Sequence, residues 1–437
     1  MALVFWPFPG SRSRPRTRIA LSLAALSCII RPTGLVLWIF LGFELVWRWR
    51  LSASRVMNLI CDTGFVGILA LAITVVIDSA YYGAPTLTPV SFVQTNILSG
   101  IARFYGVNSF HYYLTQGLPI ILGPALPFAL HGIWLQINLA STRSVSSYSP
   151  RTHNSAGSVL LGLILWTVFV YSWLAHKEWR FIHPLLPILH IFAADSLIKL
   201  GASAADWTHN APSSTPDRSK RLPIRRSHLA LLLGVSIPLN IYLIRVHGSA
   251  QVIAARYLHS LGQDQSRIKS IGVLMPCHSI PWQSHIHLPH LEREDSGSRL
   301  WVLGCEPPLG LDSVHSQSYT SQTDVFFETL GPTAYFQTYF PQNVNPAFPP
   351  SPAPYTIPGN SAPEHGWRHT WPSHLLMFGA LEHQPASLSN STQPAVTVKT
   401  RLEELGYKVI RRIGNGWEED ARRKGGIIIW EWAGRVL

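Results

Sequence analysis

The sequence concentrates ionisable side chains in one short stretch, His176-Lys177-Glu178-Trp179-Arg180-Phe181. Four of these side chains are ionisable, and the stretch lies between two apolar runs. Ionisable groups at membrane depth are costly and usually face a cavity, a partner or a substrate. We therefore interpret the stretch as a candidate site. The alternative is a short interfacial turn whose long charged side chains reach back to water.

Polar residues beside two other apolar runs could belong to the same site. Arg31 interrupts an apolar stretch, where it either faces a cavity or anchors a helix end. Aromatic residues beside a membrane mostly form an interface belt, so any single Tyr in the segment 80–113 has a structural explanation. Their concentration, together with charged neighbours, favours a site. This third set comprises Asp78, Tyr81, Tyr82, Arg103, Tyr105, His111, Tyr112 and Tyr113.

Several other chemistries find no support in the sequence. It contains no Gly-x-x-x-x-Gly-Lys-Ser/Thr loop for phosphate, no Gly-x-Ser-x-Gly nucleophile turn and no Cys-x-x-Cys pair. His278, His285, His287 and His290 lie close together, but their spacing matches no helix-face pair with a catalytic Glu. We expect no metal site.

Composition indicates a membrane protein. The 437 residues are 47% hydrophobic and 13% charged, whereas an ordinary soluble domain carries about 25% charged residues. The formal net charge is +12, which could suggest a nucleic-acid partner. The basic residues lie in short clusters between apolar runs rather than on one soluble face, so we expect membrane lipids and no nucleic acid as partners.

The apolar runs predict six or seven α-helical membrane elements. Residues 19–47 read as a broken or re-entrant helix pair, interrupted at Arg31-Pro32-Thr33, because each half is shorter than the roughly 20 residues needed to span. Single spans are expected at 59–79, 114–136, 158–175, 182–198 and 229–246, and 158–175 is the clearest.

Lys and Arg in the loops predict the orientation of these elements. Short cytoplasmic loops carry the excess of positive charge, and Arg and Lys are frequent just after Trp47 and in the loops 137–157 and 201–228. The organisation predicted is a cytoplasmic segment 1–18, a transmembrane region 19–247 and a lumenal soluble domain 248–437. Asn390, in the sequon Asn390-Ser391-Thr392, would then lie on the side where glycosylation occurs.

The last 190 or so residues have the composition of a soluble α/β domain. Strands are expected at 375–380, 408–413 and 427–432, with a helix at 396–405. Cys277 and Cys305 share the predicted oxidising side. Whether they form a disulfide stays open, because that requires Cα atoms within about 7 Å of each other.

The stretch HKEWRFIHPLLP resembles the His-Lys-Glu-x-Arg-Phe signature of glycosyltransferase family 22, with Trp179 where Glu is common. These are endoplasmic-reticulum mannosyltransferases that use dolichyl-phosphate mannose. Other segments resemble the branch that adds the third mannose of the glycosylphosphatidylinositol (GPI) anchor, so the similarity runs from about residue 19 to the end. They are IIRPTGLVLW (29–38), FYGVNSFHYYLTQGLP (104–119), IGVLMPCHSIPWQSHIH (271–287), CEPP (305–308), SHLLMFGALE and WEEDARRKGGIIIW.

The resemblance implies a GT-C fold and an inverting α-1,2-mannosyl transfer to the GPI precursor, without a metal or cofactor. Such a reaction needs a carboxylate base for the attacking hydroxyl and cations for the departing phosphate. His176, Lys177 and Arg180 would bind the donor phosphate with Glu178 orienting them, and Arg31 would be a second phosphate contact. Tyr105 and His111 match positions on the acceptor side.

The general base is less well defined. Family members carry an acidic pair in an earlier lumenal loop, whereas no Asp or Glu precedes Glu44 here, so Asp78 is the nearest substitute. We expect this chain to be part of a longer active enzyme. The alternatives are a mannosyltransferase of the dolichol-linked N-glycan precursor, a catalytically inactive paralogue, and a non-enzymatic membrane subunit or transporter.

Overall fold

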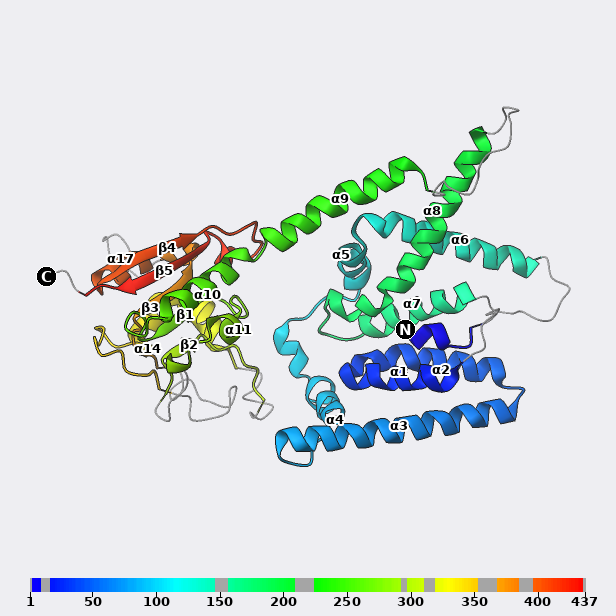
Figure 1. Cartoon of the computed structure of the whole chain (residues 1–437), viewed down its shortest axis with the longest axis horizontal. Helices are drawn as coiled ribbons and strands as arrows, with labels where there is room; N and C mark the ends of the chain where they lie inside the picture. The colour runs from blue at the N-terminus through cyan, green and yellow to red at the C-terminus, as the bar shows by residue number, and fades with distance from the viewer. Residues whose placement is uncertain are drawn as a thin grey trace. The chain divides into compact units, whose positions relative to one another are not determined.

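The chain folds as two compact units, Met1–Ile237 and Pro238–Leu437, which are described separately. The computed structural model describes residues 2–8, 16–145, 156–208, 224–291, 297–309, 319–352, 368–384 and 396–434. The first unit is helical, and the second contains a β-sheet with flanking helices (Figure 1). The division falls inside helix α9 (Arg226–Arg245).

The predicted break near Arg31 is confirmed. Helix α1 (Thr17–Ile30) ends there, a 3-10 turn η2 (Pro32–Gly34) follows, and α2 (Leu35–Trp49) continues the chain. Pro32 has no N–H and disfavours helical geometry in the residue before it, and Arg31 is accordingly extended, with φ −145° and ψ 98°. The backbone N–H of Arg31 still donates to the carbonyl of Ser27 at 3.0 Å.

Four helical segments are long and apolar enough to cross a membrane: Ala53–Tyr82, Tyr113–Asn138, His183–Gly201 and Arg226–Gly262. They correspond to four of the predicted single spans. The fifth, expected to be the clearest, is helix α7 (Ala156–Ser172), which has only 17 residues and is partly buried in the helical core. Helices α1 and α2 are short, as predicted for the two halves of residues 19–47. In the part of the chain that the structure describes, four helices are long and apolar enough to cross, and the other predicted elements form shorter helices.

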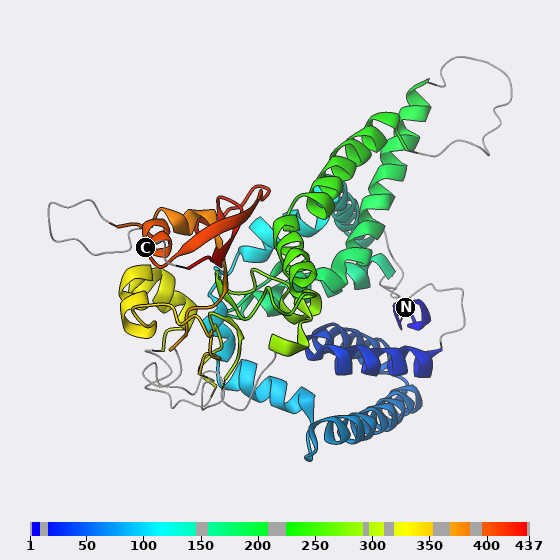
Figure 2. The same cartoon turned by 60° about the vertical axis from the view of Figure 1, so that its left-hand side comes forward.

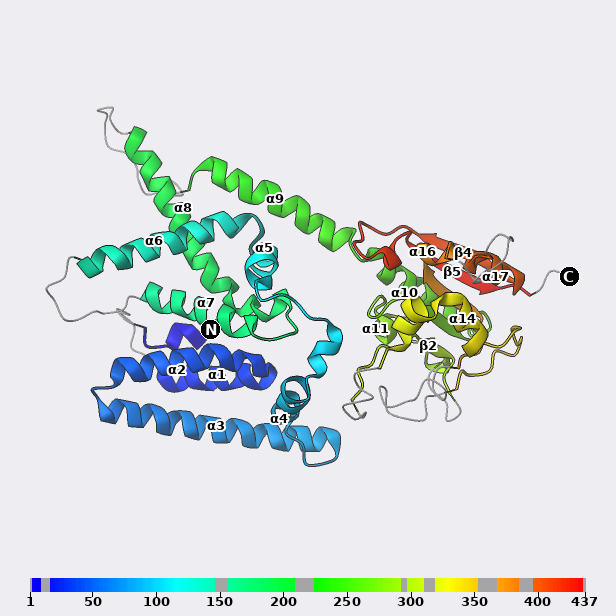
Figure 3. The same ribbon diagram turned by 180° about the vertical axis from the view of Figure 1, so that it is seen from behind.

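Small residues allow close helix packing in the first unit. Helix α3 (Ala53–Tyr82) runs beside α1 and α2 in both the front and the rear view (Figures 1 and 3). Helix α7 packs on α2, where a Cβ at Gly162 would lie 2.7 Å from Phe40 Cζ. Helices α6 (Leu126–Val145) and α8 (Leu186–Thr208) are closer still, since a Cβ at Gly132 would lie 2.0 Å from the carbonyl oxygen of Phe192.

The second unit is built on a five-stranded sheet with strand order β2-β1-β3-β5-β4. Strands β1 (Ile271–Leu274), β2 (Leu300–Val302) and β3 (His374–Phe378) are parallel. Strands β5 (Ile427–Trp432) and β4 (Tyr407–Ile413) are antiparallel to their neighbours. The three strands predicted from sequence are confirmed as β3, β4 and β5, whereas the short β1 and β2 were not predicted.

Both faces of the sheet are covered, because alternate side chains of a strand point to opposite faces. On one face, Leu376 and Ile429 join the buried stripe of helix α10 (Ser249–Gly262), which includes Ala254 and Leu258. On the other, Leu375, Met377 and Trp430 pack with the aromatic residues of α14 (Gly331–Tyr339). Helix α17 (Val398–Glu404), predicted at 396–405, lies beside β4 (Figure 2).

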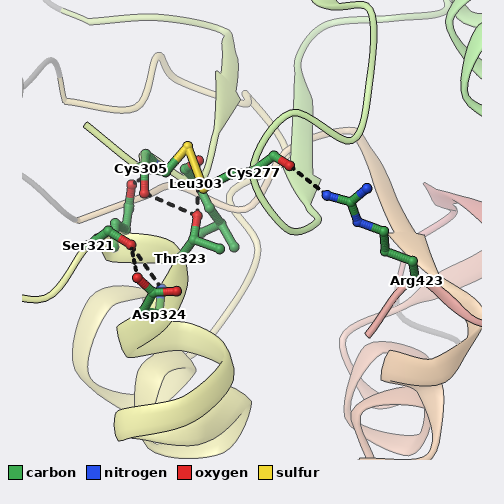
Figure 4. The surroundings of a disulfide bond; sticks show 9 residues. Cys277, Leu303, Cys305, Ser321, Thr323, Asp324 and Arg423 are labelled. Carbon is green, nitrogen blue, oxygen red and sulfur yellow. Dashed lines mark hydrogen bonds between the residues drawn. A yellow bond between two sulfur atoms is a disulfide. The ribbon is translucent and has the colours of Figure 1, made fainter. Parts of the chain in front are cut away.

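Cys277 and Cys305 form a disulfide, which sequence analysis left open. Their Cα atoms are 6.0 Å apart, and the bond joins the segments that follow β1 and β2 (Figure 4). The guanidinium of Arg423 donates to the carbonyl oxygen of Cys277 at 3.1 Å, and Thr323 Oγ1 donates to that of Gly304 at 3.1 Å. The disulfide therefore lies within a hydrogen-bonded corner of the second unit.

Removing the disulfide should destabilise the sheet. The double variant Cys277→Ala/Cys305→Ala is expected to lower the free energy of unfolding by about 3 kcal/mol, because the bond closes a 28-residue separation. The temperature at which a protease begins to cleave within residues 249–434 measures this. Cys61→Ala, which removes an exposed free cysteine, is the control. An equal shift in the two variants would contradict the prediction.

Candidate functional site

The ionisable stretch forms an irregular segment between α7 and α8. Helix α7 ends at Ser172. Residues Trp179–Phe181 form one 3-10 turn, and His183–Leu185 form a second one that leads into α8. Pro184 suits the first turn of a helix, where a missing N–H costs nothing. The side chains of residues 176–180 are therefore displayed outside the apolar helices. We call residues 176–181 the signature segment.

The carboxylate of Glu178 is the centre of the signature segment. Its Oε1 accepts from Arg180 Nη2 at 2.7 Å and lies 3.0 Å from His176 Nε2, while Oε2 pairs with Arg180 Nε. Burial alone would raise the pKa of Glu178, but the hydrogen bonds and charges of Arg180 and His176 outweigh burial and hold that pKa below its usual value. Glu178 is thus suited to orient the two cations.

His176 is held at both ring nitrogens. Nδ1 lies 3.0 Å from the carbonyl oxygen of Gly106, and Nε2 faces Glu178. The imidazole of His176 and the guanidinium of Arg180 therefore contact the same carboxylate. The side chain of Arg180 stays 63% exposed, which leaves part of its guanidinium available to a ligand.

Backbone contacts with residues 106–108 fix the signature segment. Asn108 Nδ2 donates to the Lys177 carbonyl at 2.8 Å, and Lys177 Nζ donates to the Asn108 carbonyl at 2.8 Å. The Asn108 N–H also donates to the carbonyl of Ala175 at 3.1 Å. Lys177 is only 4% exposed, and burial lowers its pKa. Its ammonium therefore holds two chain segments together rather than facing solvent.

Arg31 lies beside the signature segment, although it is far away in sequence. Its guanidinium carbon is 5.7 Å from the centre of the Phe181 ring, and that ring is 6.0 Å from the ring of His176. Tyr171 fixes the same corner, because its hydroxyl donates to the Thr33 carbonyl at 2.6 Å. Within the described residues, Arg31 makes no ion pair through its side chain. It is thus a cation free to meet an anion.

The acceptor-side candidates occupy different places. The ring of Tyr105 is 6.3 Å from that of His176, so Tyr105 belongs to the site. His111 is exposed, and its Nδ1 lies 3.1 Å from Thr115 Oγ1 and 3.5 Å from Ser109 Oγ. None of the contacts described for His111 is with the signature segment.

Asp78 is likewise not in contact with the signature segment. Its Oδ2 accepts from the backbone N–H of Thr88 at 2.9 Å and from the Thr88 hydroxyl. Thr88 begins helix α4 (Thr88–Val93), so the carboxylate satisfies a free N–H of the first turn, as helix caps do. Oδ1 has no partner among the described residues.

An apolar cavity of about 1020 Å³ lies in the first unit between α1, α2 and α3. Its wall includes Cys28 and Ile29, which shortly precede Arg31, and Pro32, which follows it directly. Helix α4 contributes Pro89, Val90 and Val93. The cavity therefore combines a long apolar lining with an unpaired cation next to it in the chain.

The N-terminal two thirds of the chain, residues 1–287, matches the model of the Alg9-like mannosyltransferase family. The chain belongs to the Alg9-like mannosyltransferase family. It is 32% identical to "GPI mannosyltransferase 3" of Aspergillus fumigatus over 96% of the chain, and 30% identical to the Yarrowia lipolytica protein of the same name over 98%. It is 32% identical to "GPI alpha-1,2-mannosyltransferase 3" of Danio rerio over 89% of the chain.

The chain spans only part of these relatives: 53% of the Aspergillus protein, 69% of the Yarrowia protein and 58% of the Danio protein. No solved structure matches the chain.

Two asparagines remain to be placed. Asn390 lies outside the described residues, so its environment is not described. Asn108 was not singled out from sequence, although it lies within the segment FYGVNSFHYY; a neutral amide beside aromatic residues gives no charge signal. In the part of the chain that the structure covers, no three His, Cys, Asp or Glu residues gather as a metal site would require.

The lowered pKa of Glu178 predicts a pH-dependent order of the signature segment. At pH values above the usual glutamate pKa of 4.5, ionised Glu178 stabilises the segment. This stabilisation is lost as pH falls through the lower pKa that Glu178 has in the folded chain. Glu178→Gln should reduce hydrogen-exchange protection of residues 176–182 at neutral pH and abolish its acid dependence. Glu44→Gln is the control. If the Glu178→Gln variant keeps the protection and the pH dependence of the wild type, ionised Glu178 does not order the signature segment.

Asn108→Ala should loosen the signature segment. The variant removes the donor to the Lys177 carbonyl, and a buried group left without its partner costs about 1–3 kcal/mol. Hydrogen exchange of residues 175–178 should become correspondingly faster. Ser109→Ala, which removes a neighbouring exposed hydroxyl that contacts only His111, should leave that exchange unchanged. Equal exchange in the two variants would mean that Asn108 does not fix the segment.

Proposed function

We propose that this chain carries the transfer site of a GPI mannosyltransferase of the endoplasmic-reticulum membrane. It would move mannose from dolichyl-phosphate mannose to the GPI precursor as the third mannose, in an α-1,2 linkage. The observation that carries the proposal is similarity to proteins named GPI mannosyltransferase 3 along nearly the whole chain. The ordered signature segment, with its cations, is compatible with that reaction.

Arg180 and Arg31 are the proposed contacts to the donor phosphate. As the bond between mannose C1 and the phosphate oxygen breaks, the phosphate takes the electron pair and gains negative charge, which fixed cations stabilise. Arg180 is oriented by Glu178 on one edge and open on the other. Arg31 faces Phe181 and makes no ion pair with any residue that the structure describes. His176 and Lys177 hold the segment through Gly106 and Asn108.

The apolar cavity is the proposed place for part of the donor's lipid chain. Its lining from α1, α2 and α3 offers no charge to a hydrocarbon, and burial of apolar surface favours such a ligand. Ile29 and Pro32 line the cavity. A phosphate bound at Arg31 would therefore lie at one end of a lipid tail bound in the cavity.

The acceptor hydroxyl would attack mannose C1 while a carboxylate takes its proton. Glu178 is engaged by two cations and has a lowered pKa, so we assign it an orienting function rather than that of the base. Asp78, with its free Oδ1, keeps the assignment as candidate base, and Tyr105 and His111 remain acceptor-side candidates. With the arginine-rich loops cytoplasmic, this chemistry and the second unit would be lumenal.

The test is rescue of cells that lack their own GPI mannosyltransferase 3. Expression of the chain should convert GPI precursors with two mannoses to precursors with three, measured by mass spectrometry of the glycolipids. Arg31→Ala and Arg180→Ala should each lower this conversion by about 100-fold, the cost of one lost charge-stabilising contact. Lys199→Ala, at an exposed pair with Asp195 on α8, should convert normally.

Two outcomes would overturn the proposal. One is that the wild-type chain, present in the membrane at normal abundance, leaves precursors at two mannoses. The other is that it lengthens a truncated dolichol-linked N-glycan precursor instead. Unchanged conversion in both arginine variants would retain the activity but refute their assignment to the phosphate.

A further inference from the structure

The loop between β4 and β5 fits closely against the end of helix α9. The backbone N–H of Trp417 donates to the Tyr242 hydroxyl at 2.7 Å. A Cβ at Gly416 would lie 2.9 Å from that hydroxyl oxygen and 3.2 Å from Val246 Cγ1. Glycine therefore lets the loop approach the last turn of α9, and all these residues belong to the second unit.

This end of α9 has the features of a membrane–water boundary. The helix is part of a candidate membrane span and exposes apolar side chains along its length, among them Leu239, Ile241 and Leu243. The apolar run stops at Arg245 and His247, which are both exposed. Tyr242 lies one turn before Arg245, where Tyr is enriched because its ring tolerates both hydrocarbon and water.

Trp417 is 70% exposed, although it is large and apolar. Its neighbours keep the loop in shape: Asn415 Nδ2 donates to Glu418 at 2.7 Å, and Arg422 pairs with Asp420 at 3.0 Å. Among the residues that the structure describes, the indole makes no ring contact or hydrogen bond. Trp, like Tyr, is enriched at membrane–water interfaces, and the hydrogen bond from the Trp417 backbone to Tyr242 holds the loop beside the end of α9.

We propose that the β4–β5 loop is an interfacial anchor, in which the Trp417 side chain enters the headgroup region of the bilayer that α9 crosses. The partner is a phospholipid surface, and no specific headgroup is required. Three carboxylates, Glu418, Glu419 and Asp420, are balanced in this loop by Arg422, Arg423 and Lys424, so the loop has no net charge to attract anionic lipids. The anchor fixes the sheet at the end of α9.

A depth measurement tests the anchor in the whole chain. Glu419→Cys, which leaves Trp417 in place, is made in a background in which Cys28 and Cys61 are replaced by Ala, and it is labelled with an environment-sensitive fluorophore. The chain is then placed in nanodiscs of phosphatidylcholine that carries a spin label on the headgroup. Quenching should be several-fold stronger than for the same probe at Lys399→Cys on α17. Equal quenching at the two positions would overturn the proposal.

A second variant removes the tryptophan. Adding Trp417→Ala to the labelled Glu419→Cys chain should abolish the quenching by the headgroup label. If quenching is the same with and without Trp417, the indole does not anchor the loop and the proposal fails. Both readouts are independent of mannosyl transfer, so they do not depend on the proposed function.

Discussion

One carboxylate, that of Glu178, brings the side chains of Arg180 and His176 together next to apolar helices. Burial alone would raise the pKa of Glu178, but its contacts with these two side chains hold that pKa below its usual value. The order of the signature segment follows, because His176 also reaches Gly106, and the adjoining Lys177 exchanges hydrogen bonds with Asn108. Without the shared carboxylate, Arg180 would have no partner to fix its direction.

The second constraint is the backbone at Pro32. A continuous helix from residue 17 to residue 49 would direct Arg31 along a regular helix face. The break instead leaves Arg31 extended and places its guanidinium over Phe181. The same break shapes the wall of the apolar cavity, since Pro32 and Leu35 line it. One residue without an N–H thus brings a cation and an apolar volume together.

Local signals predicted much of this, and non-local contacts explain the rest. The break at Arg31-Pro32, the charged segment 176–181 and strands β3 to β5 were readable because proline, charge and apolar runs act on the chain nearby. The contact of residues 106–108 with the signature segment could not be predicted from the sequence, because it depends on backbone carbonyls, which every residue has. The contact of the Asp78 carboxylate with Thr88 at the start of α4 is ten residues away in sequence and was likewise not predicted. The strands β1 and β2 are too short to carry a period of their own.

The close approach of α6 and α8 has a consequence for the site. Lipid is as apolar as the helix surfaces, so contact between membrane helices relies on small residues that let backbones meet. At Gly132 there is no space for even one methyl group beside the carbonyl of Phe192. Helix α8 begins at Leu186, five residues after the signature segment ends. A side chain added on α6 would push α8 as a rigid body and displace the start of that helix, so a residue that touches no substrate would alter how the cations are presented to it.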